Sequence, residues 1–395
     1  MSAPSEALAS RTLSDRLGIR PAIVELGPTH PSVRRVLAGA GGTASFLVTL
    51  DDDRIEALEV EIGLGHRGFE KEVESRPWLE ALPYVARLGY ASGPIAQVAY
   101  CLALERLAGL AVAERTTWQR TLVCELARAT DHLARVAALA TAIGASRAER
   151  IAQEGELVAA ALLEASIGGG PLRTWSWPGG VASDLPFGFD ERWQADRARI
   201  ARTLDALTLL LLEHPSAVQR LVDVAPLSAA DARAFAVTGP ALRAAGIARD
   251  LRRDAPQLAY AALEFEVPVG TRGDDYDRLA VVVEEIRQSL RMGDQCIERL
   301  AAMDREAARP PLVDGESCAR LFVAAGEVEL ALESATGELG FYLVSDGGPT
   351  PRRLRCRAPS FFHAQALPAV LVGARLDDLL PTAALFHLVS GECDR

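Results

Sequence analysis

The stretch 117–143, TWQRTLVCELARATDHLARVAALATAI, decides the fold. Apolar residues recur in it at i, i+3, i+4 and i+7 spacing, and it contains neither glycine nor proline, so it predicts one long helix. Its high alanine content favours close approach to neighbouring helices in a bundle. The same spacing recurs in 96–110 and 147–167, so we predict three consecutive long helices at the centre of the fold.

Further helix signals follow the central stretch, whereas strand signals lie near both ends of the chain. The later helices are expected at 190–214 and 276–303, with shorter ones at 216–224, 229–235 and within 361–395. Alternating apolar and polar residues predict strands at 45–50, 54–62, 327–333, 340–345 and 354–357. The fold class predicted is mainly α with peripheral antiparallel β (α+β): a central helical bundle with N-terminal and C-terminal β-ribbons.

The chain shows no internal repeat and no proline- or serine-rich linker, which favours a single domain. We expect a flexible tail at 1–20 and one domain over 21–395. Within that domain we expect an N-terminal β region (21–75), a helical bundle (76–310) and a C-terminal β/helix region (325–395).

Composition excludes several classes of function. With 42 Lys and Arg against 53 Asp and Glu among 395 residues, the formal charge is −11, which argues against a nucleic-acid partner. Six cysteines at 101, 124, 296, 318, 356 and 393 make no CxxC pair, which argues against thiolate zinc, thioredoxin-type and self-contained iron–sulfur sites and suits a reducing cytoplasm. We expect no signal peptide and no apolar run of the ~20 residues that span a bilayer, so a membrane role would come through partner subunits.

Three short clusters carry local chemistry, and each also has a purely structural interpretation. GPTHP at 27–31 holds a histidine on a rigid backbone or forms an ordinary loop. GHRGFEK at 65–71 suits an anion or a cluster's sulfurs, or forms a solvated turn. DDYDR at 274–278 offers carboxylates to a cation, but acidic residues at a helix start are ordinary partners of the helix dipole. No metal site is predicted.

Two other patterns are not taken as sites. Gly63-x-Gly65-x-x-Gly68 matches the dinucleotide fingerprint in its letters, but a hairpin precedes it and no βαβ unit surrounds it. Asp131 and His132 are adjacent on the predicted central helix and should point in different directions, so they do not by themselves make a catalytic dyad.

Short motifs in a fixed order extend over nearly the whole chain. They are GPTHP (27–31), IGLGHRGFEK (62–71), ALPYVARLGY (81–90), PGG (178–180), VPVGTRGDDYDR (267–278), GFYLVSDG (340–347) and GECDR (391–395). Together they resemble the D-subunit family of respiratory NADH–quinone oxidoreductase (complex I), which is related to the large subunit of nickel–iron hydrogenases. The hydrogenase cysteine pairs that hold nickel are absent, so nickel chemistry is not expected.

The resemblance implies a hydrogenase-large-subunit-like bundle that is active only as part of a complex. Quinone would be the substrate, reduced in a cavity shared with a small neighbouring subunit that holds an iron–sulfur cluster. NAD would bind elsewhere in the complex, and membrane subunits would hold this chain at the cytoplasmic face of the cell membrane. This chain alone would bind no cofactor. In the family a tyrosine at the position of Tyr90 contacts the quinone headgroup, where a phenol can supply a proton.

The sequence departs from the family at the partners of that tyrosine. The family histidine that faces the headgroup aligns with Arg34, and the aspartate that orients it aligns with Ala142, so both members of the pair are lost together. A buried aspartate without its partner would cost roughly several kcal/mol, which makes the double loss coherent. Another family histidine, near the terminal cluster, aligns with Leu172. Arg34 stays protonated, so it would act electrostatically on a quinone oxygen and not as a proton donor.

These arguments give the predicted site and leave three functions open. The catalytic residues predicted are Tyr90 and Arg34; the quinone cavity is predicted to include His30, Pro31 and Ala142; and the cluster-facing residues predicted are His66, Arg67 and Leu172. The first function is a divergent complex-I-like subunit that passes electrons to quinone. The others are a subunit of a hydrogenase-related membrane redox complex with a different acceptor, and a redox-silent structural paralogue.

Overall fold

The predicted central helix is α6, Glu114–Ala142, in a computed structural model that describes residues 22–37, 44–305 and 321–395. The predicted tail, 1–20, lies outside the described residues. Helix α6 is buried along nearly its whole length, from Arg115 to Ala140, because other elements surround it. Its polar side chains must therefore find partners inside the protein, since an unpaired polar group in the interior is costly.

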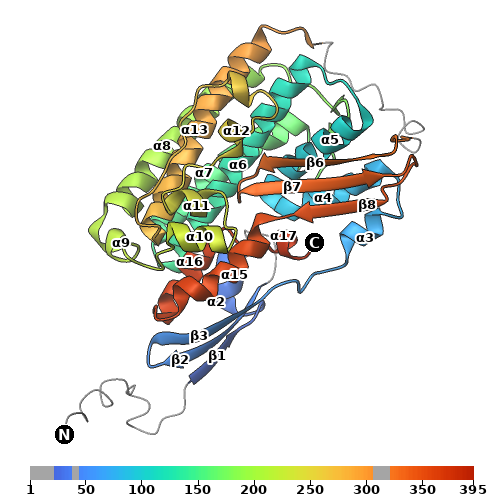
Figure 1. Cartoon of the computed structure of the whole chain (residues 1–395). Coiled ribbons are helices and arrows are strands. Elements are labelled where there is room, and N and C mark those ends of the chain that lie inside the picture. Colours follow the sequence, from blue (N-terminus) through green and yellow to red (C-terminus); the bar gives the residue numbers. More distant parts are fainter. Residues whose placement is uncertain (1–21, 38–43, 306–320) are drawn as a thin grey trace, which may run out of the picture.

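Long helices lie alongside α6 and form the bundle (Figure 1). Helix α7, Ser146–Ile167, and helix α13, Asp275–Ala301, pack directly on α6, and α8, Phe189–Leu207, packs on α7. Helix α8 ends earlier than the predicted 190–214, because the chain continues as a π-helical turn at Thr208–Glu213. Helix α5, Gly93–Ala108, covers another side of α6 and links the bundle to the C-terminal sheet.

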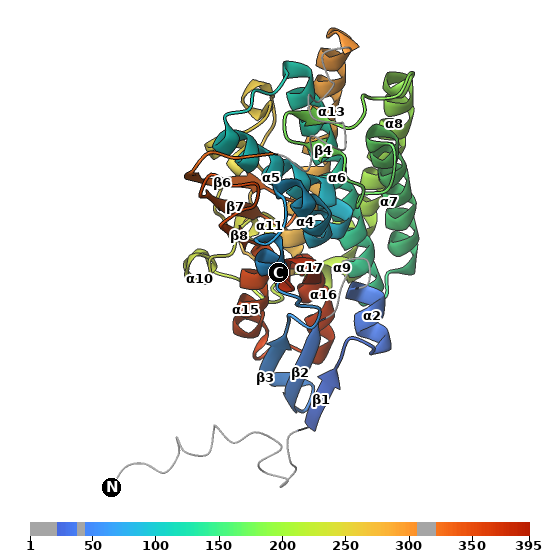
Figure 2. The ribbon, with the colours of Figure 1, turned by 90° about the vertical axis from the view of Figure 1, so that its right-hand side faces the viewer.

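The N-terminal sheet lies at one end of the bundle (Figure 2). It has three antiparallel strands in the order β1 (Ala22–Leu26), β2 (Ser45–Asp51) and β3 (Arg54–Glu61). The hairpin of β2 and β3 was predicted, whereas β1 and helix α2, Pro31–Leu37, were not. This sheet shares a second hydrophobic core with α2 and with the C-terminal helices α15, Pro359–Leu371, and α16, Leu379–Leu385.

The C-terminal sheet covers α5. Its antiparallel strands are β6 (Gly326–Glu333), β7 (Glu338–Ser345) and β8 (Arg353–Arg357), so the predicted hairpin and third strand are confirmed. Strands β6 and β7 pack on α5, and the short helix α3, Phe69–Val73, lies against β8. The sheet thereby carries the 65–71 loop region to the side of the bundle.

Short elements connect these layers. They are the 3₁₀ turns Trp78–Ala81, Tyr90–Ser92, Tyr260–Ala262 and Leu376–Asp378, helices α4 (Leu82–Gly89), α9 (Pro215–Gln219), α10 (Ala229–Ala234), α11 (Pro240–Ala244), α12 (Leu251–Asp254) and α17 (Ser390–Cys393), and the two-residue strands β4 (Ser176–Trp177) and β5 (Gly180–Val181). The prediction of a mainly α fold with peripheral antiparallel β is confirmed. Within the described residues, none of the helices combines the length and the apolar character that crossing a membrane requires.

Candidate functional site

Tyr90 occupies the sharp corner between α4 and α5. Its φ of 46° and ψ of −94° place a non-glycine residue in a sparsely populated backbone region. Such a conformation costs about 1–3 kcal/mol and persists only where the surroundings enforce it. Here the chain reverses directly after Gly89 and re-enters the core at Gly93, so the turn holds the phenol at the edge of the bundle with its side chain half-buried.

A cavity of about 430 Å³ lies beside Tyr90. Three segments that are far apart in the sequence wall it: the loop and first turn of α3, the α4 helix, and the C-terminal segment. Its lining residues are Gly65, Arg67, Phe69, Glu72, Tyr84, Arg87, Leu88, Tyr90, Gly391 and Asp394. We call this space the Tyr90 cavity. It combines apolar and aromatic surface with two arginines and two carboxylates, as sites for small organic molecules commonly do.

Close packing of the C-terminus builds one wall of the Tyr90 cavity. Gly391 approaches α4 so closely that a Cβ atom there would lie 2.8 Å from Tyr90 Cε2. Asp394 Oδ1 accepts a hydrogen bond from the Gly65 backbone N–H at 3.0 Å. His66 Nδ1 donates to the main-chain carbonyl of Asp394 at 3.2 Å. The last residues of the chain are therefore fixed to the 65–71 loop.

The electrostatics of the cavity favour a protonated phenol. Burial raises the pKa of the Tyr90 hydroxyl, the negative charge of Asp394 raises it further, and Arg87 opposes them. Burial also raises the pKa of Asp394, against the hydrogen bond from Gly65 and the charge of His66. Among the described residues the Tyr90 hydroxyl has no hydrogen-bond partner, so its proton is available to a bound molecule.

The structure brings part of the predicted site together. Tyr90 and Arg67 line the same cavity, and His66 is held at its edge through Asp394. Sequence reasoning missed Arg87 and Asp394. The motifs ALPYVARLGY and GECDR contained both residues, but no local pattern indicates that the C-terminus packs against the turn at Tyr90.

Arg34, His30, Pro31 and Ala142 do not line the Tyr90 cavity. His30 Nδ1 accepts from the Ser32 backbone N–H at 3.3 Å, so the histidine stabilises the start of α2. The Arg34 side chain is exposed on α2. Helix α2 packs on α6, and Ala142, at the end of α6, packs on the same hydrophobic core as α2. The structure thus places the α2 segment and Ala142 together, at a different location from the residues around Tyr90.

Leu172 lies in the loop after α7 and is exposed to 38% of its surface. This loop also contacts the Tyr90 turn: a Cβ on Gly93 would lie 3.0 Å from the carbonyl oxygen of Pro171. An exposed leucine next to the turn that carries Tyr90 is consistent with a surface covered by another chain.

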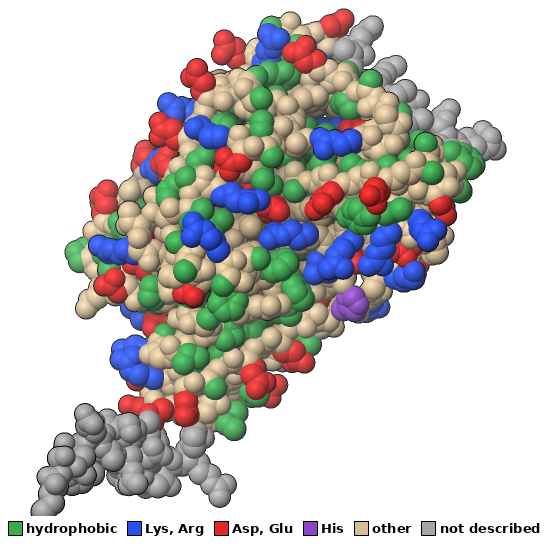
Figure 3. All heavy atoms as spheres, viewed as in Figure 1, with side chains coloured by type: hydrophobic (Ala, Val, Ile, Leu, Met, Phe, Trp, Pro, Cys, Tyr) green, Lys and Arg blue, Asp and Glu red, His purple; other side chains and the backbone are tan. Residues whose placement is uncertain are grey.

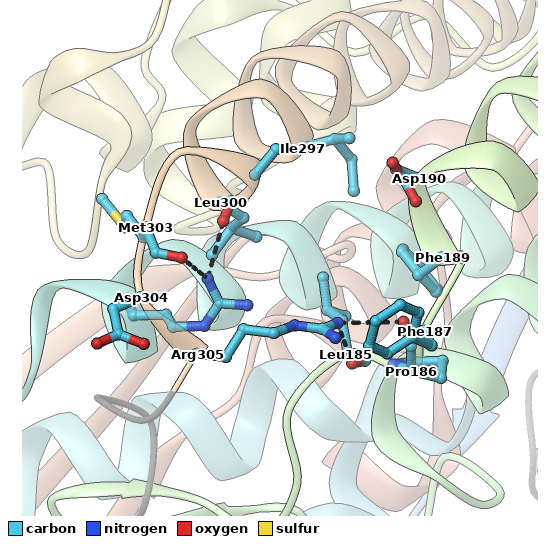
Figure 4. Close-up of a pocket in the computed structure, with 13 residues that line it drawn as sticks. Leu185, Pro186, Phe187, Phe189, Asp190, Ile297, Leu300, Met303, Asp304 and Arg305 are labelled. Carbon is cyan, nitrogen blue, oxygen red and sulfur yellow. Dashed lines mark hydrogen bonds between the residues drawn. The ribbon is translucent and has the colours of Figure 1, made fainter.

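A larger cavity, of about 550 Å³, lies between the end of α13 and the loop before α8 (Figure 4). It shares no lining residue with the Tyr90 cavity and contains none of the predicted site residues. Its principal cation, Arg115, is fully engaged, because it pairs with Asp184 at 2.9 Å and donates to the Leu300 carbonyl at 2.8 Å. We call it the Phe187 cavity, after the aromatic ring at its rim.

The acidic cluster at the start of α13 has a structural role. Asp274 is the N-cap and accepts from the Asp277 backbone N–H at 2.9 Å, while Asp277 Oδ2 accepts from the Thr271 backbone N–H at 2.7 Å. Asp275 pairs with Arg278 at 2.6 Å. The interpretation as a helix start is therefore confirmed. The Gly63–Gly68 loop follows an antiparallel strand, which also removes the context that dinucleotide binding requires.

Basic side chains gather over β8 and α3, next to the Tyr90 cavity (Figure 3). Arg352, Arg353 and Arg355 are exposed on or beside β8, and Lys71 is exposed on α3. Acidic residues dominate the chain as a whole, so a local basic surface is a feature that a partner or a charged ligand can recognise.

Fold and cavity together define a class: a mainly α protein whose chain ends close a half-buried phenol site at the edge of a helical bundle. Comparison with known proteins gives the family. The family model described as respiratory-chain NADH dehydrogenase, 49 Kd subunit, matches residues 153–395. The first of two D-subunits of NADH-quinone oxidoreductase from Anaeromyxobacter dehalogenans is 35% identical over 390 residues, covering 94% of this chain and 89% of the relative. The D-subunit from Ehrlichia canis is 35% identical over 400 residues, covering 97% of this chain and 100% of the relative.

The chain therefore belongs to the D-subunit family of NADH-quinone oxidoreductase, and the resemblance predicted from the motifs is confirmed. Of the three functions left open by the sequence, these comparisons support the complex-I-like subunit.

Proposed function

We propose that this chain is a subunit of an NADH–quinone oxidoreductase and that the Tyr90 cavity receives the quinone headgroup. The observation that carries the proposal is the Tyr90 hydroxyl: it faces a cavity, has no hydrogen-bond partner among the described residues, and has a raised pKa. A quinone carbonyl accepts hydrogen bonds and takes up a proton after reduction, so a protonated phenol is the complementary group.

The residues of the cavity fit the charge changes of this reaction. Reduction of a quinone to a quinol consumes two electrons and two protons. The Tyr90 hydroxyl can donate a hydrogen bond to the oxygen that gains charge, and the Arg67 and Arg87 guanidinium groups stabilise that charge electrostatically. The Phe69 and Tyr84 side chains provide apolar surface for the ring of the headgroup.

The remaining parts of the reaction belong to partners. We propose that a small neighbouring subunit holds the iron–sulfur cluster that supplies the electrons, that NAD binds elsewhere in the complex, and that membrane subunits hold this chain at the cytoplasmic face of the cell membrane. His66, Arg67 and Leu172 are exposed, which fits a surface that the cluster-bearing subunit covers. The basic surface over β8 and α3 adjoins them and would steer an acidic partner.

Arg34 is proposed as an electrostatic contact on the tail side of the substrate. Its exposed position on α2, outside the Tyr90 cavity, makes a direct role in proton transfer less well supported than that of Tyr90. Replacing it should therefore raise KM for quinone more than it lowers kcat.

The test is the rate of NADH-driven quinone reduction by the purified complex, divided by its rate with a water-soluble artificial electron acceptor. Tyr90→Phe should lower this ratio roughly 100-fold, the scale of a lost proton donor. Tyr342→Phe is the matched control, because its hydroxyl bonds Glu327 on the exposed side of β7. Arg34→Ala should raise KM by about tenfold or less. If Tyr90→Phe leaves the ratio unchanged in an active complex, the Tyr90 cavity is not the reduction site.

A further inference from the structure

Three metal-ligating side chains meet inside the bundle, away from the residues that line the Tyr90 cavity. Asp131 and His132 come from the middle of α6, and His387 comes from the turn after α16. One ligand atom from each lies within 4.8 Å of the other two, and all three side chains are buried. The His132 and His387 ring centroids are 5.1 Å apart, and Asp131 Oδ1 lies 3.7 Å from His387 Nε2. Although Asp131 and His132 are adjacent on the helix, both reach His387.

The hydrogen bonds of His132 define which of its nitrogens is free. His132 Nε2 lies 3.0 Å from Glu285 Oε2, and Glu285 in turn accepts from Arg243 Nε at 2.7 Å. With its carboxylate held by an arginine, Glu285 is the acceptor and His132 Nε2 carries the proton. His132 Nδ1 then presents a bare lone pair, and this buried atom has no partner among the described residues.

His387 is the least satisfied polar side chain of the three. Only 1% of its surface is exposed, yet neither ring nitrogen has a hydrogen-bond partner among the described residues. Its φ of 53° places a non-glycine residue in the left-handed region, so the fold holds this ring in place at the expense of backbone strain. By contrast, the buried His363 has carbonyl oxygens at 2.7 and 3.1 Å from its two nitrogens. Incomplete pairing is thus specific to the Asp131 cluster.

We propose that Asp131, His132 and His387 form a binding site for one divalent cation of the zinc class. Two imidazole nitrogens and one carboxylate oxygen are a ligand set that Zn²⁺ adopts, with a fourth position left for water. A carboxylate that orients a ligating histidine through its other nitrogen is the usual outer partner in such sites, and Glu285 occupies that position. Bonds of about 2.1 Å require the ligand atoms to close to roughly 3.4 Å, so rotation of the His387 ring toward α6 is part of the proposal.

The site would brace the wall of the Tyr90 cavity. Asp131 Oδ2 accepts from Ser92 Oγ at 3.0 Å, and Ser92 lies in the turn that begins with Tyr90. His387 precedes the segment that contains Gly391 and Asp394. A cation bound to Asp131 and His387 would therefore tie the C-terminal segment and the Tyr90 turn to the same point of α6. One cation lies nearby: Arg135 Nε is 3.4 Å from Asp131 Oδ1, a long contact that the bound ion would displace.

The test is metal content. The full, untagged chain is produced in medium supplemented with Zn²⁺ or with Co²⁺, dialysed, and analysed by inductively coupled plasma mass spectrometry. We expect one ion per chain in the wild type. Asp131→Asn and His387→Ala should lower the occupancy at least tenfold. Glu285→Gln should weaken binding roughly 10–100-fold, as loss of an outer carboxylate does. The exposed His214→Ala is the matched control and should retain the ion.

Spectroscopy separates this site from the five described cysteines, which are all buried and free. The Co²⁺ form should show the visible bands of nitrogen and oxygen ligation without the intense near-ultraviolet band of a cobalt–thiolate bond. The proposal is overturned if the wild type binds neither Zn²⁺ nor Co²⁺ stoichiometrically, if the cobalt–thiolate band is present, or if folded Asp131→Asn retains the ion. The wild-type result stands even where a variant does not fold. Because metal content is measured without quinone, its outcome is independent of the proposed function.

Discussion

The Tyr90 cavity and the Phe187 cavity differ in how their polar groups are used. The Phe187 cavity is the larger, about 550 Å³ against about 430 Å³. Its buried arginine, Arg115, is paired with a carboxylate and two carbonyl groups, so its polar atoms are committed to holding the fold. In the Tyr90 cavity the phenol has no partner among the described residues, and the backbone beneath it is strained. Unused hydrogen-bonding capacity, and not volume, distinguishes the site that can act on a substrate.

Arg115→Ala should give the largest effect on stability and test the structural half of this comparison. It leaves the Asp184 carboxylate and the Leu300 carbonyl without their donor. Loss of one partner of a buried pair costs about 3–5 kcal/mol, and the partial exposure of Asp184 places the expected value near the lower end. Urea denaturation of the full chain measures it. The exposed pair of Arg299 with Glu114 provides the control: Arg299→Ala should cost less than about 1 kcal/mol. Equal effects of the two variants would contradict the assignment.

Gly391→Ala should disturb the Tyr90 cavity from its C-terminal wall. The added Cβ would lie 2.8 Å from Tyr90 Cε2 and 2.9 Å from the Leu88 carbonyl oxygen, so α17 must move away from α4. We expect a loss of about 1–3 kcal/mol in the free energy of unfolding, with a lower quinone-reduction ratio. Gly170→Ala is the control, because no heavy atom lies within 4 Å of its added Cβ. A Gly391→Ala protein with unchanged stability and ratio would show that this wall does not position Tyr90.

Asp394→Asn should change the titration of Tyr90 without removing a wall of the cavity. The negative charge of Asp394 disfavours the phenolate, so its removal should lower the pKa of Tyr90 toward the ordinary value. Proton donation by Tyr90 should accordingly decline at a lower pH in the variant than in the wild type. Phenolate difference absorbance measures the change, with Tyr90→Phe as the reference that assigns the signal. A Tyr90 pKa that stays the same or rises would contradict the proposed electrostatics.

Phe187→Ala should have the smallest effect of the four. Phe187 is 95% exposed, and its ring contacts the Arg305 guanidinium at 4.9 Å. An exposed cation–π contact contributes about 0.5–1 kcal/mol, so stability should change by no more than that. The quinone-reduction ratio should not change. A large loss of quinone reduction in this variant would instead point to the Phe187 cavity as the substrate site.

The sequence predicted the long elements well because their signals are local. The apolar spacing of 117–143 predicted α6, and the β6–β7 hairpin followed from a polar turn between alternating strands. Strand β1 and helix α2 were missed, since each is short and depends on packing against distant segments such as α15 and α16. Helix α8 was predicted too long, because no simple pattern indicates a π-helical turn.

The site could be predicted only in part for the same physical reason. Tyr90 and Arg67 came from motifs whose family was confirmed, and they do share a cavity. Asp394 and Gly391 reach that cavity through a contact across more than three hundred residues, which periodicity does not encode. The Asp131 cluster was missed similarly, because its third member, His387, lies far along the chain from α6.

Photoaffinity labelling with an azidoquinone tests the central claim most directly. The complex is illuminated with the probe, digested, and the modified peptides are identified by mass spectrometry, with excess unlabelled quinone as the competitor. The account predicts competed labelling within 65–72, 84–90 or 391–394, the three segments that wall the Tyr90 cavity. Competed labelling confined to 185–190 or 297–305, around the Phe187 cavity, would contradict it.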